Sequence, residues 1–299
     1  MSGTDNGVYG SVIPGQDTWS ESAMVLYFDE ALRNGFSFRI SRFPERNATW
    51  VWCHVIHDGA LYCYTEHRLP CASHRIDPDV THAIYDVPNR DASITRGGSS
   101  QALTVLSFSA RVLSSKGEGG VEGPGDVQVA LEGRFRPGHL RSGSPTGRFE
   151  RTGEVEATLT VNGKAVSLSG LAKAHEQTQT RPRFNNPFTY TMLWGHDASL
   201  VALMARDRRY GSYEDGDRDY PIENFGITQR SPQRSFSASF DAGRRRITGT
   251  AETIYKYKVP VFERMWRGHV VAAQVEGRRL VGMINDWRSE DQIYEASVS

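Results

Sequence analysis

A group of side chains able to transfer a proton or anchor a ligand follows one alternating segment near the middle of the chain. Residues 166–174 alternate apolar and polar types, as a half-buried strand does. The polar side chains that come next are those of His175, Glu176, Gln177, Arg181 and Arg183. A base, a carboxylate, an amide and two guanidinium groups at one strand end suit proton transfer or ligand anchoring. The alternative is a strand end facing water, with Glu176 paired to Arg181 or Arg183.

Aromatic and polar residues recur in the second half of the chain, at the ends of further predicted strands. They are Trp194, His196, Tyr210, Trp266 and Trp287. If these strands are neighbours in a barrel, their ends share one rim with His175 and Glu176. An aromatic wall with a few polar groups is how a site holds a hydrophobic small molecule. The alternative is that these tryptophans are ordinary core and rim residues.

Other kinds of site are poorly supported by the sequence. The nine histidines and three cysteines lack the spacing of a metal site. His54 and His57 are three residues apart, which in a strand sends them to opposite faces. The chain has neither a Gly-x-Ser-x-Gly nucleophile motif nor a glycine-rich phosphate loop before a helix. We therefore expect no metal and no cofactor.

Charge and hydropathy limit the partners and the location. The 35 basic residues balance the 35 acidic ones, which argues against nucleic acid and anionic membranes as partners. The chain has no uncharged apolar run of about 18 residues, so we expect no membrane span. Its first residues lack the pattern of a signal peptide, which predicts a cytoplasmic protein with reduced cysteines. The sequence leaves the oligomeric state open.

Strand-like segments must position these residues, because helical patterns are nearly absent. Short runs rich in aromatic and β-branched residues recur at spacings of about 8 to 15 residues. Asp58-Gly59 and Asn162-Gly163 each separate two such runs, which predicts hairpins. The sequence predicts an all-β protein with two antiparallel β-barrel or barrel-like domains. We place an amino-terminal domain at residues 1–155 and a carboxy-terminal domain at residues 156–299.

Parts of the chain resemble a known superfamily. Val161-Asn-Gly-Lys164, then Gly170-Leu-Ala-Lys-Ala-His-Glu-Gln177 and Arg183, are similar to the Gly-x-Gly-x-x-(Asp/Glu)-His-x-Trp-Gly segment of the double lipocalin-like superfamily. That superfamily includes carotenoid 1,2-hydratases and lipocalin-like Diels–Alderases. Trp19-Ser-Glu21 and the aromatic runs after it resemble its amino-terminal domain. Here Ala172 replaces a glycine, the acid follows the histidine, and no Trp-Gly pair follows.

The resemblance implies two lipocalin-like domains packed side by side, with a site for a hydrophobic substrate. We expect a cofactor-independent lyase, isomerase or cyclase acting on an isoprenoid, polyketide or polycyclic molecule. His175 or Glu176 would move a proton, while Arg181, Arg183 or Tyr210 would bind a carbonyl or carboxylate. The alternative function is a non-catalytic carrier that holds a hydrophobic ligand unchanged.

Overall fold

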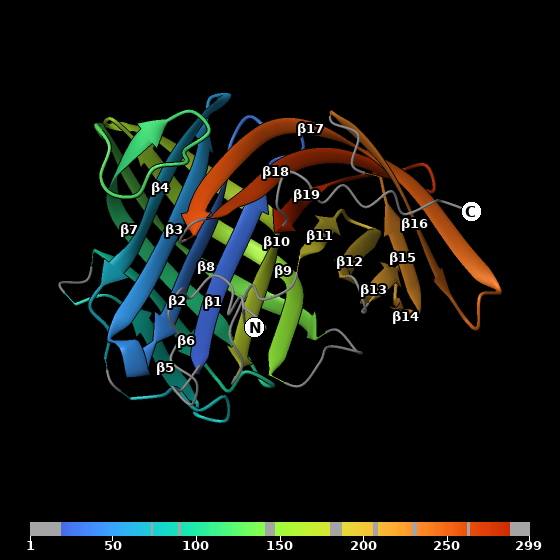
Figure 1. The fold of residues 1–299 in the computed structure, drawn as a ribbon, viewed down its shortest axis with the longest axis horizontal. Coiled ribbons are helices and arrows are strands. Elements are labelled where there is room, and N and C mark those ends of the chain that lie inside the picture. The colour runs from blue at the N-terminus through green and yellow to red at the C-terminus, as the bar shows by residue number, and fades with distance from the viewer. Residues whose placement is uncertain are drawn as a thin grey trace, which may run out of the picture. The chain divides into compact units, whose positions relative to one another are not determined.

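The computed structural model confirms an all-β protein made of two antiparallel sheets (Figure 1). The structure describes residues 19–72, 74–88, 91–140, 147–179, 187–205, 209–228, 232–261 and 264–287. In these ranges the helical structure is one short 3-10 turn, η2 (Pro44–Arg46). None of the described helices is long and apolar enough to cross a membrane.

The first unit contains a ten-stranded sheet that closes on itself. Its strand order is β4-β3-β2-β1-β10-β9-β8-β7-β6-β5, and a further pairing joins β4 to β7. The strands are β1 (Ser20–Phe28), β2 (Gly35–Phe43), β3 (Ala48–His57), β4 (Ala60–Leu69), β5 (His82–Asp86), β6 (Ala92–Gly97), β7 (Val105–Lys116), β8 (Val127–Leu140), β9 (Arg148–Val161) and β10 (Lys164–Gln179). The result is a barrel in which the last strand, β10, lies between β9 and the first strand, β1.

The second unit contains a nine-stranded sheet with the corresponding order, β14-β13-β12-β11-β19-β18-β17-β16-β15. The strands are β11 (Phe188–Trp194), β12 (Ala198–Ala205), β13 (Arg209–Asp215), β14 (Arg218–Ile222), β15 (Asn224–Ile227), β16 (Gln233–Phe240), β17 (Arg245–Val261), β18 (Arg264–Val275) and β19 (Arg278–Trp287). Here too the last strand, β19, pairs with the first, β11. The two units therefore repeat one topology.

The boundary between the units lies further along the chain than residue 155. The described residues from 19 to 179 belong to the first compact unit, and the described residues from 187 to 287 belong to the second. The expected boundary falls inside β9, which pairs with β8 on one side and β10 on the other. The glycine-rich segment before Arg148 lies between β8 and β9 in the chain, and most of it is outside the described residues.

Both predicted hairpins are present. Asn162 and Gly163 have φ values of 48° and 79° between the paired residues Val161 and Lys164. Asp58 and Gly59, at 51° and 80°, connect β3 to β4 in the same way. Positive φ at both central residues is the type I′ geometry that matches the twist of the flanking strands.

Strand alternation divides the side chains of each barrel into an inner and an outer face. The inner face of the first unit is a buried apolar cluster that includes Val25, Phe38, Val51 and Leu159. A second apolar cluster, including Leu200, Phe236 and Ile284, fills the second unit. On β10 the inner side chains Leu168, Ala172 and Ala174 define which later residues point inward.

We predict that Gly282→Ala destabilises the second unit. Gly282 lies on β19 between Leu193 of β11 and Val271 of β18, and a Cβ atom there would come within 2.0 Å of the Met192 carbonyl oxygen. The backbone must shift to accept the methyl group, which costs about 1–3 kcal/mol. Scanning calorimetry should show a lower Tm.

Gly226→Ala on β15 is the control, because a Cβ atom there would meet nothing within 4 Å. We expect its Tm to stay at or slightly above that of the parent protein, since alanine restricts the unfolded chain. Equal Tm values for the two variants would contradict the close strand packing at Gly282.

Candidate functional site

His175 and Glu176 do not form one site, because they are consecutive residues of β10. Successive side chains of a strand point to opposite faces of the sheet. Glu176 continues the inner series Ala172 and Ala174, whereas His175 continues the outer position of Lys173. The two predicted catalytic residues therefore belong to separate clusters on the two sides of the barrel wall.

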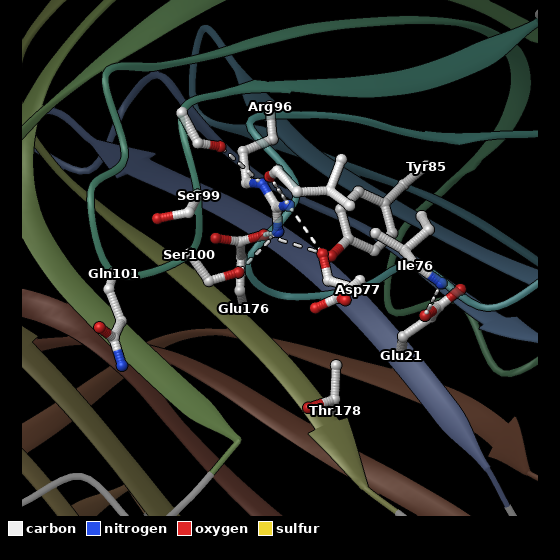
Figure 2. A network of polar contacts seen from close by, with 12 residues as sticks. Glu21, Ile76, Asp77, Tyr85, Arg96, Ser99, Ser100, Gln101, Glu176 and Thr178 are labelled. Atoms are coloured by element: carbon white, nitrogen blue, oxygen red, sulfur yellow. Dashed lines mark hydrogen bonds and ion pairs between the residues drawn. The ribbon is translucent and has the colours of Figure 1, made fainter.

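Glu176 lies in a buried polar network at one end of the barrel interior (Figure 2). Its Oε1 atom accepts hydrogen bonds from Arg96 Nη1 at 3.1 Å and from the Tyr85 hydroxyl at 3.2 Å. Burial, together with the charge of Glu176, raises the pKa of Tyr85 well above its usual value. Tyr85 therefore stays protonated and donates a hydrogen bond to the carboxylate.

Arg96 uses all of its donors inside the barrel. Besides Glu176, it donates to the carbonyl oxygens of Asp77, Val80 and Gly98 and to the Ser100 hydroxyl, at distances between 2.6 and 3.2 Å. The guanidinium is fully buried, and its acceptors come from the loops on either side of the β5–β6 hairpin. Figure 2 shows Arg96 between Asp77, Ser100 and Glu176. This arrangement fixes the two loops against the barrel end.

A second buried ion pair lies on the same inner face. Arg42 Nη1 donates to Glu21 Oε1 at 2.7 Å, and Arg42 Nη2 donates to the carbonyl oxygens of Ala72 and His74. The second oxygen of Glu21 accepts from the Ile76 amide at 2.8 Å. The inner charged groups thus bind loop backbone, which is the pattern of a structural network.

The outer face of the same wall carries a row of registered residues, which we call the outer-face row. Neighbouring partners across β3, β2, β1, β10 and β9 are Trp52, Arg39, Met24, His175 and Glu150. Registered residues share a face, with Cβ atoms about 4.5–5.5 Å apart. All five side chains are buried, with at most 8% exposure. The outer-face row places an aromatic ring, a cation, a base and a carboxylate in line.

His175 is held as a neutral base in this row. Its Nδ1 atom lies 3.4 Å from Glu150 Oε1. Burial lowers the pKa of His175 to about 4, because it outweighs the opposing effect of Glu150, and the positive charges of Arg148 and Arg39 add smaller shifts in the same direction as burial. Burial alone would raise the pKa of Glu150, but its basic neighbours hold it below the usual range. An Nδ1–H directed toward an ionised carboxylate would make Nε2 the proton-accepting nitrogen of a neutral imidazole.

Trp52 and Arg39 form the other end of the row. The Arg39 guanidinium carbon lies 5.3 Å from the centre of the Trp52 ring. Arg39 Nε donates to Ser41 at 3.0 Å and its Nη2 donates to Ser22 at 3.2 Å. Trp50 lies two residues before Trp52 on the same face, with ring centres 6.2 Å apart and planes 20° apart. Together they place two nearly parallel, buried indole rings beside a cation, a combination that suits a conjugated ligand with an oxygen substituent.

The other predicted residues of the first unit are only partly placed. Gln177 points to the outer face with His175, is half-buried, and donates to Gln179 at 2.7 Å. Arg181 and Arg183 lie outside the described residues. The structure therefore brings Gln177 to the side of His175 and leaves the two arginines as predictions.

The predicted aromatic residues of the second unit fall into two groups. Trp266 and Trp287 are buried with ring centres 6.4 Å apart, and the Trp266 indole N–H donates to Asn285 Oδ1 at 3.3 Å. The other three residues lie at different places along the segment from β11 to β13. Trp194 is buried at the end of β11, His196 is exposed in the following turn, and Tyr210 is half-buried on β13.

Sequence reasoning missed Glu150, Arg39, Trp50 and Trp52. Trp50 and Trp52 are two residues apart in a strand-like run, a spacing that places them on one face. The partnership of Glu150 with His175 depends on strand pairing, which the local pattern does not show. Within the described ranges, no group of three or more His, Cys, Asp and Glu side chains could hold a metal ion.

The comparisons with known proteins give structural similarity without sequence similarity. No family model matches the chain, and no curated protein matches it either. A solved structure from Nitrosomonas europaea, provisionally named AttH, has a TM-score of 0.58 at 12% identity and covers 92% of this chain and 98% of its own. The structure of CghA has a TM-score of 0.59 at 10% identity, covering 90% and 88%.

Kievitone hydratase from Nectria haematococca gives a TM-score of 0.48 at 9% identity, covering 89% and 88%. The first two similarities extend over both units of the chain and concern the fold alone. They agree with the repeated strand order described above. The chain therefore has the double lipocalin-like fold that its sequence resembles.

Proposed function

We propose that the protein is an enzyme of lyase or isomerase/cyclase type that acts on a hydrophobic small molecule without a redox cofactor. The observation that carries the proposal is the outer-face row, in which a neutral His175 lies between Glu150 and a tryptophan–arginine surface. Base, cation and aromatic rings are the groups needed to bind a conjugated substrate and move one of its protons.

His175 would act as the base through Nε2. Glu150 would orient the imidazole and stabilise the imidazolium that forms after proton transfer, the role that a buried carboxylate has beside a catalytic histidine. A positioned base contributes about 10²- to 10⁴-fold to the rate. The same imidazolium could return the proton to another atom of the substrate, which would complete an isomerisation or an elimination.

Arg39 and the two tryptophans would bind the substrate. The nearly parallel rings of Trp50 and Trp52 would pack against an isoprenoid, polyketide or polycyclic framework, and Arg39 would polarise a carbonyl oxygen. Orientation by such a surface can lower a reaction barrier by several kcal/mol. A pericyclic cyclisation would use this orientation without needing a base.

Glu176 would have a structural role in this scheme. Its Oε1 atom already accepts two hydrogen bonds, and its partner Arg96 is saturated by loop backbone. The carboxylate compensates a guanidinium that has no exposure to solvent. In this scheme Glu150, and not Glu176, is the acidic residue that acts with His175.

We predict that His175→Asn lowers turnover by about 10²- to 10⁴-fold while the fold and ligand affinity are largely kept. The substrate would first be identified by mass spectrometry of compounds that copurify with the protein or are consumed by it. Glu150→Gln should lower turnover by a smaller factor, because the imidazole loses its orienting charge. A wild-type protein that protects its ligand unchanged would show a carrier, and wild-type turnover in His175→Asn would remove this residue from the reaction.

We predict that Glu176→Gln acts on stability. It leaves Arg96 buried without a counter-charge, which costs about 3–5 kcal/mol, and turnover per folded molecule should stay nearly constant. Glu156→Gln is the control, since Glu156 pairs with Arg136 at 3.1 Å with both side chains more than half exposed. That change should cost at most about 1 kcal/mol. A large loss of turnover in Glu176→Gln at unchanged Tm would show that Glu176 takes part in the reaction.

We predict that His175 stays neutral until the pH approaches about 4, against 6.5 for a solvated histidine. Nitrogen-15 NMR of the imidazole, assigned with His175→Asn, measures this directly. Because the folded-state pKa is lowered, the contribution of His175 to stability is complete above pH 6.5 and is lost as the pH falls toward 4. Glu150→Gln should lower the pKa of His175 further, and a titration near 6.5 would contradict the buried site.

A further inference from the structure

The indole of Trp52 is held by a histidine from the neighbouring strand. Its Nε1 donates to His67 Nε2 at 2.7 Å, and His67 lies on β4, next to β3. An indole nitrogen is only a donor, so Nε2 must be the unprotonated nitrogen of His67. The proton is then on Nδ1, which donates a hydrogen bond to the Oε1 atom of Glu122. Trp52 thus donates a hydrogen bond to His67, and His67 donates one to Glu122.

His67 also packs against the second tryptophan. The His67 and Trp50 ring centres are 4.4 Å apart, and Phe43 packs against the Trp50 ring at 4.6 Å. His67 is nearly buried, at 9% exposure. One imidazole therefore contacts both rings of the aromatic surface, by a hydrogen bond to one and a ring contact to the other.

Glu122 comes from the β7–β8 connection, residues 117–126. This connection is fastened along its length by backbone hydrogen bonds from Gly117 to Leu61, from Gly123 to Thr65 and from Gly125 to Leu113. Glu122 therefore sits on a segment with fixed ends and reaches His67 with a side chain that is 29% exposed. The segment gives the carboxylate a defined position, although it is not a strand.

We infer that His67 and Glu122 are positioning residues for the substrate-binding surface formed by Trp50 and Trp52. Glu122 fixes the tautomer of His67, and His67 fixes the plane of the Trp52 indole against Arg39. The role in substrate binding depends on the proposed function, whereas the fixing of the indole does not. A surface with fixed planes loses less side-chain freedom when a flat ligand binds.

Three variants test this inference. His67→Leu removes both hydrogen bonds, Glu122→Gln weakens the control of the tautomer, and His67→Gln can restore both bonds, because its amide oxygen accepts from Trp52 and its amino group donates to Glu122. His82→Leu and Glu132→Gln are the matched controls, since both residues are exposed positions of the same unit.

The first measurement is hydrogen exchange at the Trp52 indole N–H, followed in nitrogen-15 spectra of the full chain and assigned with Trp52→Phe. Loss of one hydrogen bond should speed this exchange about tenfold in His67→Leu, with a smaller effect in Glu122→Gln and recovery in His67→Gln. The controls should leave it unchanged. Unchanged exchange in a folded His67→Leu protein would overturn the inference.

The second measurement is binding of the apolar probe 1-anilinonaphthalene-8-sulfonate, read from the Trp50 and Trp52 indole resonances. The Kd should rise about tenfold in His67→Leu, recover in His67→Gln and stay constant in the controls. The probe could leave these resonances unchanged in the parent protein while indole exchange is still faster in His67→Leu. That result would count against the proposed binding surface, but the fixing of Trp52 by His67 would stand. Equal Kd values in His67→Leu and the parent protein would overturn the positioning role.

Discussion

The buried charge pair between Arg96 and Glu176 determines how the first barrel is closed at one end. An unpaired guanidinium in an apolar interior would be strongly destabilising, so Arg96 requires both the carboxylate and the loop carbonyl groups around it. The second unit repeats this solution on its own last strand. Asp286 of β19 accepts from Arg234 and from Thr189, each at 2.7 Å, and all three are buried. In each unit a buried acid near the end of the last strand pairs with a buried arginine.

Because the buried arginines need counter-charges, the acids on the inner face of the first barrel stabilise the fold, and the proposed chemistry lies on its outer face. The inner acids are committed to arginines, whereas the outer face of β10 presents His175 to a row of residues from other strands. A carboxylate that compensates a buried cation cannot also take up a proton without exposing that cation to the apolar interior. Glu150 differs from Glu176 because its partners include a histidine that can remain neutral.

Much of the fold could be predicted because alternation and turn residues are local signals. Asn162-Gly163 gave the β9–β10 hairpin, and the aromatic runs gave the strands. The expected boundary at residue 155 falls inside β9, because a glycine-rich connection between two strands of one sheet has the same composition as a linker. Alternation alone would have separated His175 from Glu176. The contacts of His175 with Glu150 and of Trp52 with Arg39 depend on which strands pair, and pairing of β1 with β10 joins segments far apart in the chain.

The adjacency of His175 and Glu176 on β10 has a consequence for how the protein can change during evolution. Insertion or deletion of a single residue between Gly170 and His175 would send every later side chain to the opposite face, with the base inside the barrel and the acid outside. Length changes in this strand should therefore be excluded by selection. Point substitutions on the outer face leave the interior packing intact, so new ligand preferences can arise there one residue at a time without a matching change in the core.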